Sequence, residues 1–158
     1  MRRLFVDFLL KKMEADPNTI LLSGDLGYGL FDPIRSKFPK QFYNFGSSEL
    51  TMVTAACGMA LEGKKVYCYS ITPFILWRPF EAIRNYLDKE CIPVKLIGGG
   101  RDQDYGYLGF SHWGHDDLKF MSNFTKITSV KPLDEKTLLS SLEEAHNAKN
   151  AYYINLKK

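Results

Sequence analysis

The strongest constraint on the fold is an alternation along the chain between short apolar runs and longer segments with helical periodicity. The apolar runs are typical of buried strands, which we predict at 19–24, 41–45, 65–70, 93–98, 125–130 and 151–156. Helices are predicted between them at 4–13, 33–38, 49–61, 73–89 and 116–121, with a further helix capped by Asp134. Pro79 is a predicted kink site within the fourth of these helices.

Strands that alternate with helices form a mainly parallel sheet with helices on both of its faces. The sequence contains no repeat, linker or low-complexity tract. We therefore predict a single, doubly wound α/β domain over residues 1–158. Because ligands bind at the carboxyl ends of the strands in such sheets, we expect the loops at 24–29, 45–49 and 98–112 to converge there.

The helix that follows Gly46 consists largely of small and apolar residues and carries one carboxylate, Glu49, at its start. Its alanines and Gly58 would allow another backbone to approach closely, so we expect this helix to be buried. A carboxylate in such a place is costly unless it is paired or protonated, and its pKa should rise. The alternative is an ordinary helix start, where the helix dipole favours a glutamate.

Composition excludes several classes of protein. The chain has no apolar run long enough to cross a membrane, and an early Asp7 makes its start a poor signal peptide. Its net charge of +3 is too small and too scattered to indicate nucleic-acid binding. Three cysteines, Cys57, Cys68 and Cys91, lack metal-site spacing and are typical of reduced thiols. We therefore expect a cytoplasmic protein with neither a nucleic-acid nor a membrane partner.

Three clusters contain residue types that carry chemistry. His112, His115 and Asp116 include metal-ligand types, but Asp116 is better interpreted as a helix start, and we expect no metal site in this chain. The segment Gly98–Arg101 resembles a phosphate cradle without the lysine of a P-loop or the spacing of a dinucleotide fingerprint. The segment Tyr69–Arg78 places an aromatic residue and a cation after a strand, and core packing with a surface charge is its alternative.

The order of these segments along the chain is more specific than any one of them. It runs through Ser23–Tyr28, Gly46–Ala60, Tyr69–Arg78, Tyr105-Gly106 and Gly109–His112. In this order the chain resembles the pyrimidine-binding domain of transketolases, enzymes that use thiamine diphosphate. The resemblance extends nearly without gaps from about residue 2 to residue 156.

The resemblance assigns roles to individual residues. Glu49 falls where the family has the glutamate that hydrogen-bonds the aminopyrimidine ring of the cofactor, and Phe74 falls at the ring-stacking aromatic residue. Asp25 and Leu26 fall in the loop that approaches the thiazolium, and His112 matches the histidine that faces the substrate. On this basis a protonated Glu49 would favour the imino form of the pyrimidine, which then deprotonates the thiazolium.

Three arginines complete the predicted site. Arg78 ends the aromatic segment and is assigned to the cofactor, while Arg2 matches a phosphate-contacting arginine of transketolases. Arg101 falls where the related deoxyxylulose-phosphate synthases carry an anion-binding arginine, with little side-chain bulk from the preceding glycines to hinder an anion. The alternative for Arg101 is a solvated loop arginine bound to Asp102 or Asp104.

Departures from the family pattern define the expected partner. The sequence has no Gly-Asp-Gly motif for the diphosphate and Mg²⁺, so we expect a separate diphosphate-binding subunit to hold Mg²⁺, with two copies of each subunit. Tyr107-Leu108-Gly109 replaces Glu-Asp-Gly, and Gly100 stands at a phosphate-contacting histidine, which puts a standard ketose donor in doubt.

The predicted function is that of the pyrimidine-binding subunit of a split, transketolase-like enzyme that transfers a two-carbon ketol unit on a small anionic sugar or keto compound. One alternative is a subunit of a thiamine-dependent decarboxylase or 2-oxoacid dehydrogenase. The other is a non-catalytic interaction domain that kept the fold.

Overall fold

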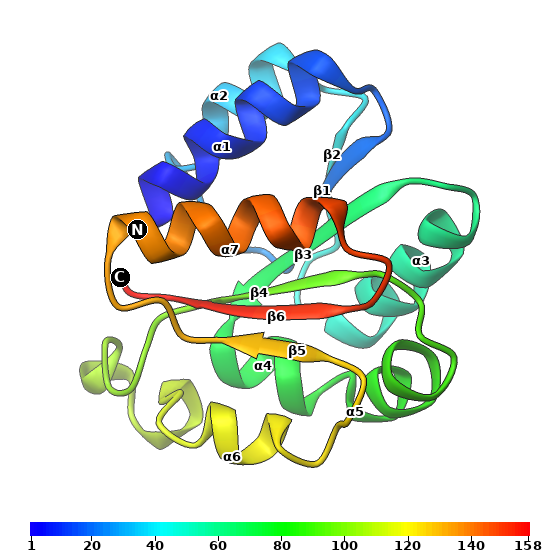
Figure 1. Cartoon of the computed structure of the whole chain (residues 1–158). Helices are drawn as coiled ribbons and strands as arrows, with labels where there is room; N and C mark the ends of the chain where they lie inside the picture. The colour runs from blue at the N-terminus through cyan, green and yellow to red at the C-terminus, as the bar shows by residue number, and fades with distance from the viewer.

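A computed structural model describes all residues from 1 to 158 and shows one six-stranded sheet in which every neighbouring pair of strands is parallel (Figure 1). The strand order is β2-β1-β3-β4-β6-β5. The strands are β1 (Thr19–Ser23), β2 (Phe42–Asn44), β3 (Lys65–Ile71), β4 (Lys95–Gly99), β5 (Thr128–Val130) and β6 (Tyr152–Leu156). The inner strands β1, β4 and β6 are buried along their whole length, as strands covered on both faces must be. The predicted doubly wound α/β fold is confirmed.

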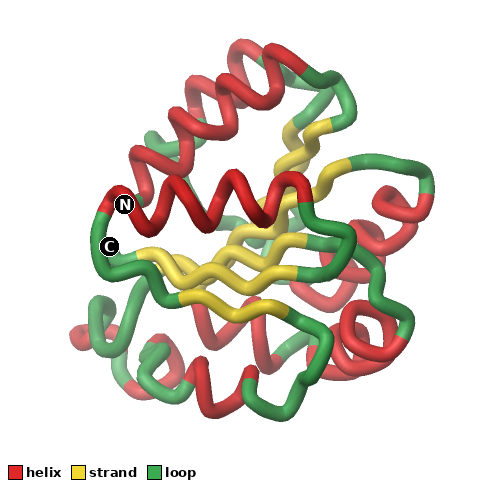
Figure 2. The backbone as a smooth tube through the Cα atoms, in the orientation of Figure 1, coloured by secondary structure: helices red, strands yellow, loops and turns green.

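Helices cover both faces of the sheet (Figures 1 and 2). On one face lie α1 (Arg2–Ala15), α2 (Asp32–Lys37) and α7 (Glu135–Asn147), whose apolar side chains form one core cluster with the sheet. On the other lie α3 (Glu49–Leu61), α4 (Thr72–Trp77), α5 (Phe80–Ala82) and α6 (Asp117–Met121), with a second cluster. A π-helical segment (Ile83–Lys89) and two 3-10 turns (Gly106–Leu108 and Phe110–His112) complete the fold. None of its helices is both long and apolar enough to span a lipid bilayer.

The helix predicted over 73–89 is interrupted where a proline stands. The α4 helix ends at Trp77, and α5 begins at Phe80, directly after Pro79. Proline has no backbone N–H and its ring clashes with the preceding turn, so it breaks a helix at this point. The predicted kink is confirmed, and it leaves Arg78 at the end of α4.

The α3 helix differs from the sequence expectation. Only one of its faces is buried, the face that includes Met52 and Ala56, while Gly58 has no neighbour within 4 Å of a would-be Cβ atom. Leu61 is 71% exposed at the end of this helix. The expectation of a fully buried helix is therefore wrong for the isolated chain, because no other element packs against its second face.

The strand order changes direction between β1 and β3, because β2 is added to one side of this pair and β4 to the other. After β1 the chain passes through α2 on one face to reach β2, and after β3 it passes through α4 on the other face to reach β4. A crevice therefore opens outside the carboxyl ends of β1 and β3, which is where doubly wound sheets bind their ligands. Gly24 follows β1 at this crevice, and Thr72 follows β3.

His146, in the last turn of α7, is 6% exposed and is buried against the sheet. Its Nδ1 lies 2.9 Å from the hydroxyl of Tyr67 on β3, and the two rings stack at a centroid distance of 6.2 Å. Desolvation first, and then the nearby Lys65 and Lys12, lower the pKa of His146 to about 4.

This shift gives the fold an acid-sensitive histidine. Since the pKa of His146 is lower in the folded state than its ordinary value of 6.5, the unfolded chain binds the proton more readily. We expect the contribution of His146 to be fully present above pH 6.5 and lost as pH falls toward 4, by roughly 2–3 kcal/mol. Urea unfolding at pH 7, 5.5 and 4.5 measures it. The His146→Gln variant should lose less stability over this interval, and parallel pH profiles for both proteins would contradict the assignment.

Candidate active site

Glu49 is the first residue of α3, and its carboxylate lies in the crevice at 1% exposure. Ser70 Oγ on β3 donates to Oε1 at 2.7 Å, and Arg78 Nη1 donates to Oε2 at 2.7 Å. The side chain of the N-cap residue, Ser48, makes no capping hydrogen bond. Glu49 therefore faces two partners across the crevice and does not act as an ordinary helix-start residue, and the buried carboxylate is paired, as its desolvation requires.

Gly24 allows the end of β1 to pass directly beside this carboxylate. A Cβ atom at position 24 would lie 3.0 Å from Glu49 Oε1 and 2.9 Å from Ser70 Oγ. No side chain other than hydrogen fits between these groups without moving them. Gly24 is therefore required for the position of Glu49.

Phe74 on α4 and Arg78 at the C-cap of this helix line the same pocket as Gly24. The Arg78 guanidinium lies over the Phe74 ring, with its central carbon 3.7 Å from the ring centroid, while it also pairs with Glu49. A pocket of about 160 Å³ opens here, lined by Gly24, Asp25, Leu26, Ser47, Glu49, Ile71, Phe74 and Arg78. The buried Glu49 carboxylate and the Phe74 ring both border this pocket, and the Arg78 guanidinium contacts both of them.

The loop after β1 forms the edge of this pocket. Asp25 has a left-handed backbone conformation, with φ of 54°, and its carboxylate accepts hydrogen bonds from the Tyr28 hydroxyl at 2.6 Å and from Asn44 at 3.3 Å. These bonds, with that of Tyr28 the stronger, lower the pKa of Asp25. The backbone oxygen of Leu26 accepts from Ser23 Oγ at 2.6 Å, which holds the loop against the strand end.

His112 brings the third predicted loop to the same place. Its ring meets the Phe74 ring edge-on at a centroid distance of 5.0 Å, and its Nδ1 lies 3.0 Å from Ser111 Oγ. The predicted convergence of three loops is therefore confirmed. Five of the site residues predicted from the sequence line this pocket: Asp25, Leu26, Glu49, Phe74 and Arg78. His112 does not line it, but its ring contacts the ring of Phe74.

Arg101 lies apart from this pocket. Its guanidinium donates to the side-chain and backbone oxygens of Asn155, both at 2.9 Å, and the residue is 7% exposed. The alternative of a solvated arginine is wrong, because only its backbone N–H bonds Asp104. The expectation that the glycines before Arg101 leave room for an anion to approach is also wrong, because the Tyr105 ring packs on Gly100. An anion-binding role for Arg101 stays a prediction.

Arg2 also lies away from Glu49. It is half-buried at the start of α1, and its Nη1 donates to the Tyr105 hydroxyl at 3.5 Å. Its hydrogen-bond partner, Tyr105, does not line the Glu49 pocket, and the predicted contact of Arg2 with a substrate phosphate stays a prediction.

Sequence reasoning missed an aromatic pocket of about 250 Å³ that shares Phe74 and Arg78 with the Glu49 pocket. Its other walls include Trp77, Phe110 and Trp113. The Trp113 indole N–H is buried and has no hydrogen-bond partner. The one sequence signal for this pocket is an aromatic content of 14%, which is high and favours a ligand or partner surface without giving its place.

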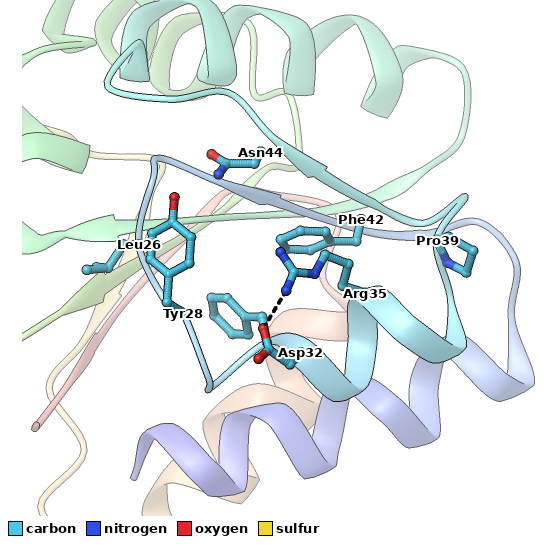
Figure 3. A pocket seen from close by; sticks show the side chains of 9 residues that line it. Leu26, Tyr28, Asp32, Arg35, Pro39, Phe42 and Asn44 are labelled. Atoms are coloured by element: carbon cyan, nitrogen blue, oxygen red, sulfur yellow. Dashed lines mark hydrogen bonds and ion pairs between the residues drawn. The ribbon is translucent and has the colours of Figure 1, made fainter.

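Another pocket, of about 270 Å³, lies on the far side of the β1 loop, between α2 and β2 (Figure 3). Leu26 borders both this pocket and that of Glu49. The two charged side chains of the pocket between α2 and β2 are Asp32 and Arg35. They form an ion pair, drawn as a dashed line in Figure 3, with Arg35 Nη2 2.9 Å from Asp32 Oδ1. Both of these side chains are more than half exposed to solvent, whereas the Glu49 carboxylate is buried beside an aromatic ring, so we assign the candidate active site to the Glu49 pocket.

Comparison with known families agrees with this geometry. Residues 1–158 match the family described as "Transketolase, pyrimidine binding domain". The chain belongs to this family. The predicted resemblance is therefore confirmed over the whole chain.

Curated relatives give the context in which this domain occurs. A putative transketolase C-terminal section from Methanocaldococcus jannaschii is 25% identical, and the match covers 100% of this chain and 50% of the relative. One of the subunits of an apulose-4-phosphate transketolase from Actinobacillus succinogenes is 29% identical over 78% of this chain and 40% of the relative. The pyrimidine-domain chain thus spans about half or less of these relatives.

Solved structures show the same fold. A split-gene transketolase in an inactive β4 tetramer superimposes with a TM-score of 0.85 at 23% identity, over 99% of this chain and 50% of the other. Transketolase from Campylobacter jejuni superimposes with a TM-score of 0.88 at 18% identity, over 99% of this chain and 25% of the other.

Proposed function

We propose that this chain is the pyrimidine-binding subunit of a split, transketolase-like enzyme that uses thiamine diphosphate to transfer a two-carbon ketol unit. The observation that carries the proposal is the buried carboxylate of Glu49 beside the Phe74 ring, at the crevice between β1 and β3. Family membership supports it, as do relatives that are named as a C-terminal section or as one subunit of a transketolase.

The residues of the pocket fit the pyrimidine half of the cofactor. An aminopyrimidine is a flat ring with nitrogen donors and acceptors, and Phe74 offers a ring face while Glu49 offers a carboxyl group that can share a proton. The cofactor, when bound, supplies the carbon–carbon chemistry, and the protein supplies binding, orientation and proton control. The hydrogen bond from Ser70 Oγ to Glu49 Oε1 holds the carboxyl group in one orientation. Asp25 and Leu26 form the edge over which the rest of the cofactor would pass.

Arg78 has a double role in this proposal. It pairs with Glu49 and covers one face of Phe74, so it holds the carboxylate in place while the pocket contains no ring. A flat ring that needs the same face and the same oxygen competes with the guanidinium. Binding of the pyrimidine therefore requires Arg78 to move, and its half-exposed position on α4 permits this.

A separate diphosphate-binding subunit would supply Mg²⁺, the diphosphate contacts and the rest of the site, in a complex with two copies of each chain. The exposed face of α3 is the proposed contact surface, since Gly58 and Leu61 are free there. His112 would face the substrate, an anionic sugar or keto compound. The three free thiols support a place in the cytoplasm.

Assembly tests the proposal. The chain is co-expressed with the diphosphate-binding subunit of its own organism, and light scattering after size exclusion gives the mass. We expect a complex with two copies of each chain, and the activity should require both chains. Leu61→Glu on α3 should prevent co-purification, whereas Leu133→Glu, at a leucine that is 86% exposed outside α3, should not. Full ketol transfer by the chain alone would exclude the split enzyme. Decarboxylation without ketol transfer would favour the dehydrogenase alternative.

A further inference from the structure

A second polar pocket lies at the opposite end of the sheet from Glu49. Lys65 begins β3 and Lys95 begins β4, whereas Glu49 lies beyond the carboxyl end of β3. His146 enters from the last turn of α7. The pocket has a volume of about 350 Å³ and is lined by Ala60, Gly63, Lys64, Lys65, Pro93, Lys95, His146, Asn147, Ala148 and Lys149. Four lysines and a histidine line it, and no carboxylate does.

The charge of these lysines is largely uncompensated. Lys65 has one carboxylate partner, Asp16, at 3.5 Å. Lys64 donates to the neutral amide oxygen of Asn18 at 2.6 Å, and Lys149 is exposed without a partner. No carboxylate lies within 4.0 Å of the ammonium groups of Lys64, Lys95 or Lys149.

Lys95 is the most unusual member of the cluster. It is 2% exposed, a degree of burial that lysine almost never has without a paired charge. Its ammonium group donates to the backbone oxygens of Pro93 at 2.6 Å and Ala148 at 3.4 Å, and both residues line the pocket. The third N–H of the ammonium group has no protein acceptor.

The surroundings of this pocket disfavour the protonated forms of Lys95 and His146. Desolvation and then Lys65 lower the pKa of Lys95 to about 8. His146, whose Nε2 lies 3.3 Å from Lys65 Nζ, is held neutral at pH 7 by the same causes. An anion in the pocket would relieve this repulsion and would favour the protonated form of both groups.

Other charges around the pocket do not balance the lysines. The carboxyl ends of α3 and α7 point here and contribute about half a negative charge each. Glu143 on α7 is bound to Lys12 at 2.7 Å, so its charge is already paired. A positive field therefore remains in a concave space that is larger than one phosphate ion.

We propose that this pocket binds a phosphate group, either as an inorganic ion or carried by a small molecule, at a site separate from the Glu49 crevice. The site goes beyond the proposed function and does not depend on it. Lys64 and Lys149 would contact the ligand from the rim, and Lys65, Lys95 and His146 would contact it from the floor.

The three histidines of the chain allow the site to be located by NMR. His146 reports on this pocket, while His112 and His115 report on the opposite end of the sheet. Inorganic phosphate and glycerol 3-phosphate are titrated into the full chain at constant ionic strength. We expect saturable shifts of the His146 ring resonances below about 1 mM ligand and a rise in its pKa, with His112 and His115 unmoved.

A charge-removing pair of substitutions gives the control. Lys64→Gln combined with Lys149→Gln should weaken binding by about tenfold or more, while Lys136→Gln on the exposed face of α7 should leave it unchanged. Tighter binding of inorganic phosphate identifies the free ion as the ligand, and tighter binding of the ester identifies a phosphorylated small molecule. Equal affinity of the double variant, shifts confined to His112 and His115, or no binding at about 10 mM would each overturn the proposal.

Discussion

Glu49→Gln in the assembled enzyme should reduce kcat by about 100- to 10,000-fold, the usual loss when a proton-sharing group is removed. The amide keeps the size of the side chain and can still accept the Ser70 hydrogen bond, so the fold should remain. It cannot share a proton with a pyrimidine nitrogen as a carboxyl group does. Its ion pair with Arg78 is also lost, at a partner that is half-exposed to water.

The kinetics are measured on the co-purified complex, and circular dichroism of the variant checks the fold. Glu62→Gln is the matched control, because Glu62 follows the same helix at its exposed end. This control should keep the turnover of the parent protein. A Glu49→Gln enzyme with unchanged kcat would contradict the proposed catalytic role of Glu49 and leave it a structural one, through its bonds to Ser70 and Arg78.

Asn155→Ala should lower the free energy of unfolding by about 2–3 kcal/mol, the range for losing a buried hydrogen bond to a charged group. Asn155 on β6 is fully buried and accepts the Arg101 guanidinium through two oxygens. Its amide also donates to Thr72 Oγ1 at 3.1 Å and to the Tyr153 hydroxyl at 3.0 Å. The substitution removes the acceptor of Arg101 Nε and both amide bonds, while the backbone oxygen of residue 155 still accepts from Arg101 Nη2.

A second substitution separates the lost hydrogen bond to the buried cation from simple loss of packing. Arg101→Met in the Asn155→Ala background removes the buried cation that has lost its Nε acceptor, so the double variant should be more stable than the single one. Asn147→Ala, at an exposed asparagine of α7, should change stability little. Urea unfolding measures all of these variants. A loss below about 1 kcal/mol for Asn155→Ala would contradict the role of this network.

The periodicity of apolar residues was sufficient to predict the helices and strands of the fold. The apolar runs predicted all six strands, and Pro79 predicted the break after Trp77. Glu49 could be found because a carboxylate at the start of a helix of small residues needs a reason. The convergence of three loops followed from parallel strand order alone.

Contacts between distant segments could not be predicted in the same way. Arg78 meets Glu49 only because α4 turns back over the crevice, and Arg101 meets Asn155 only because β4 and β6 are neighbours. No local pattern encodes either pairing. The lysine pocket is likewise assembled from three separate segments of the chain, around Lys64, Pro93 and Lys149. These segments are far apart in the sequence, so no local pattern predicts the pocket.

The central claim is that this chain provides the pyrimidine half of a thiamine diphosphate site whose other half lies on a partner. Calorimetric titration of thiamine diphosphate with Mg²⁺ tests it directly, using the chain alone, the diphosphate-binding subunit alone and their equimolar mixture. The mixture should bind at micromolar concentration, at least about tenfold tighter than either chain alone. Micromolar binding by this chain alone, or no gain on mixing, would contradict the claim.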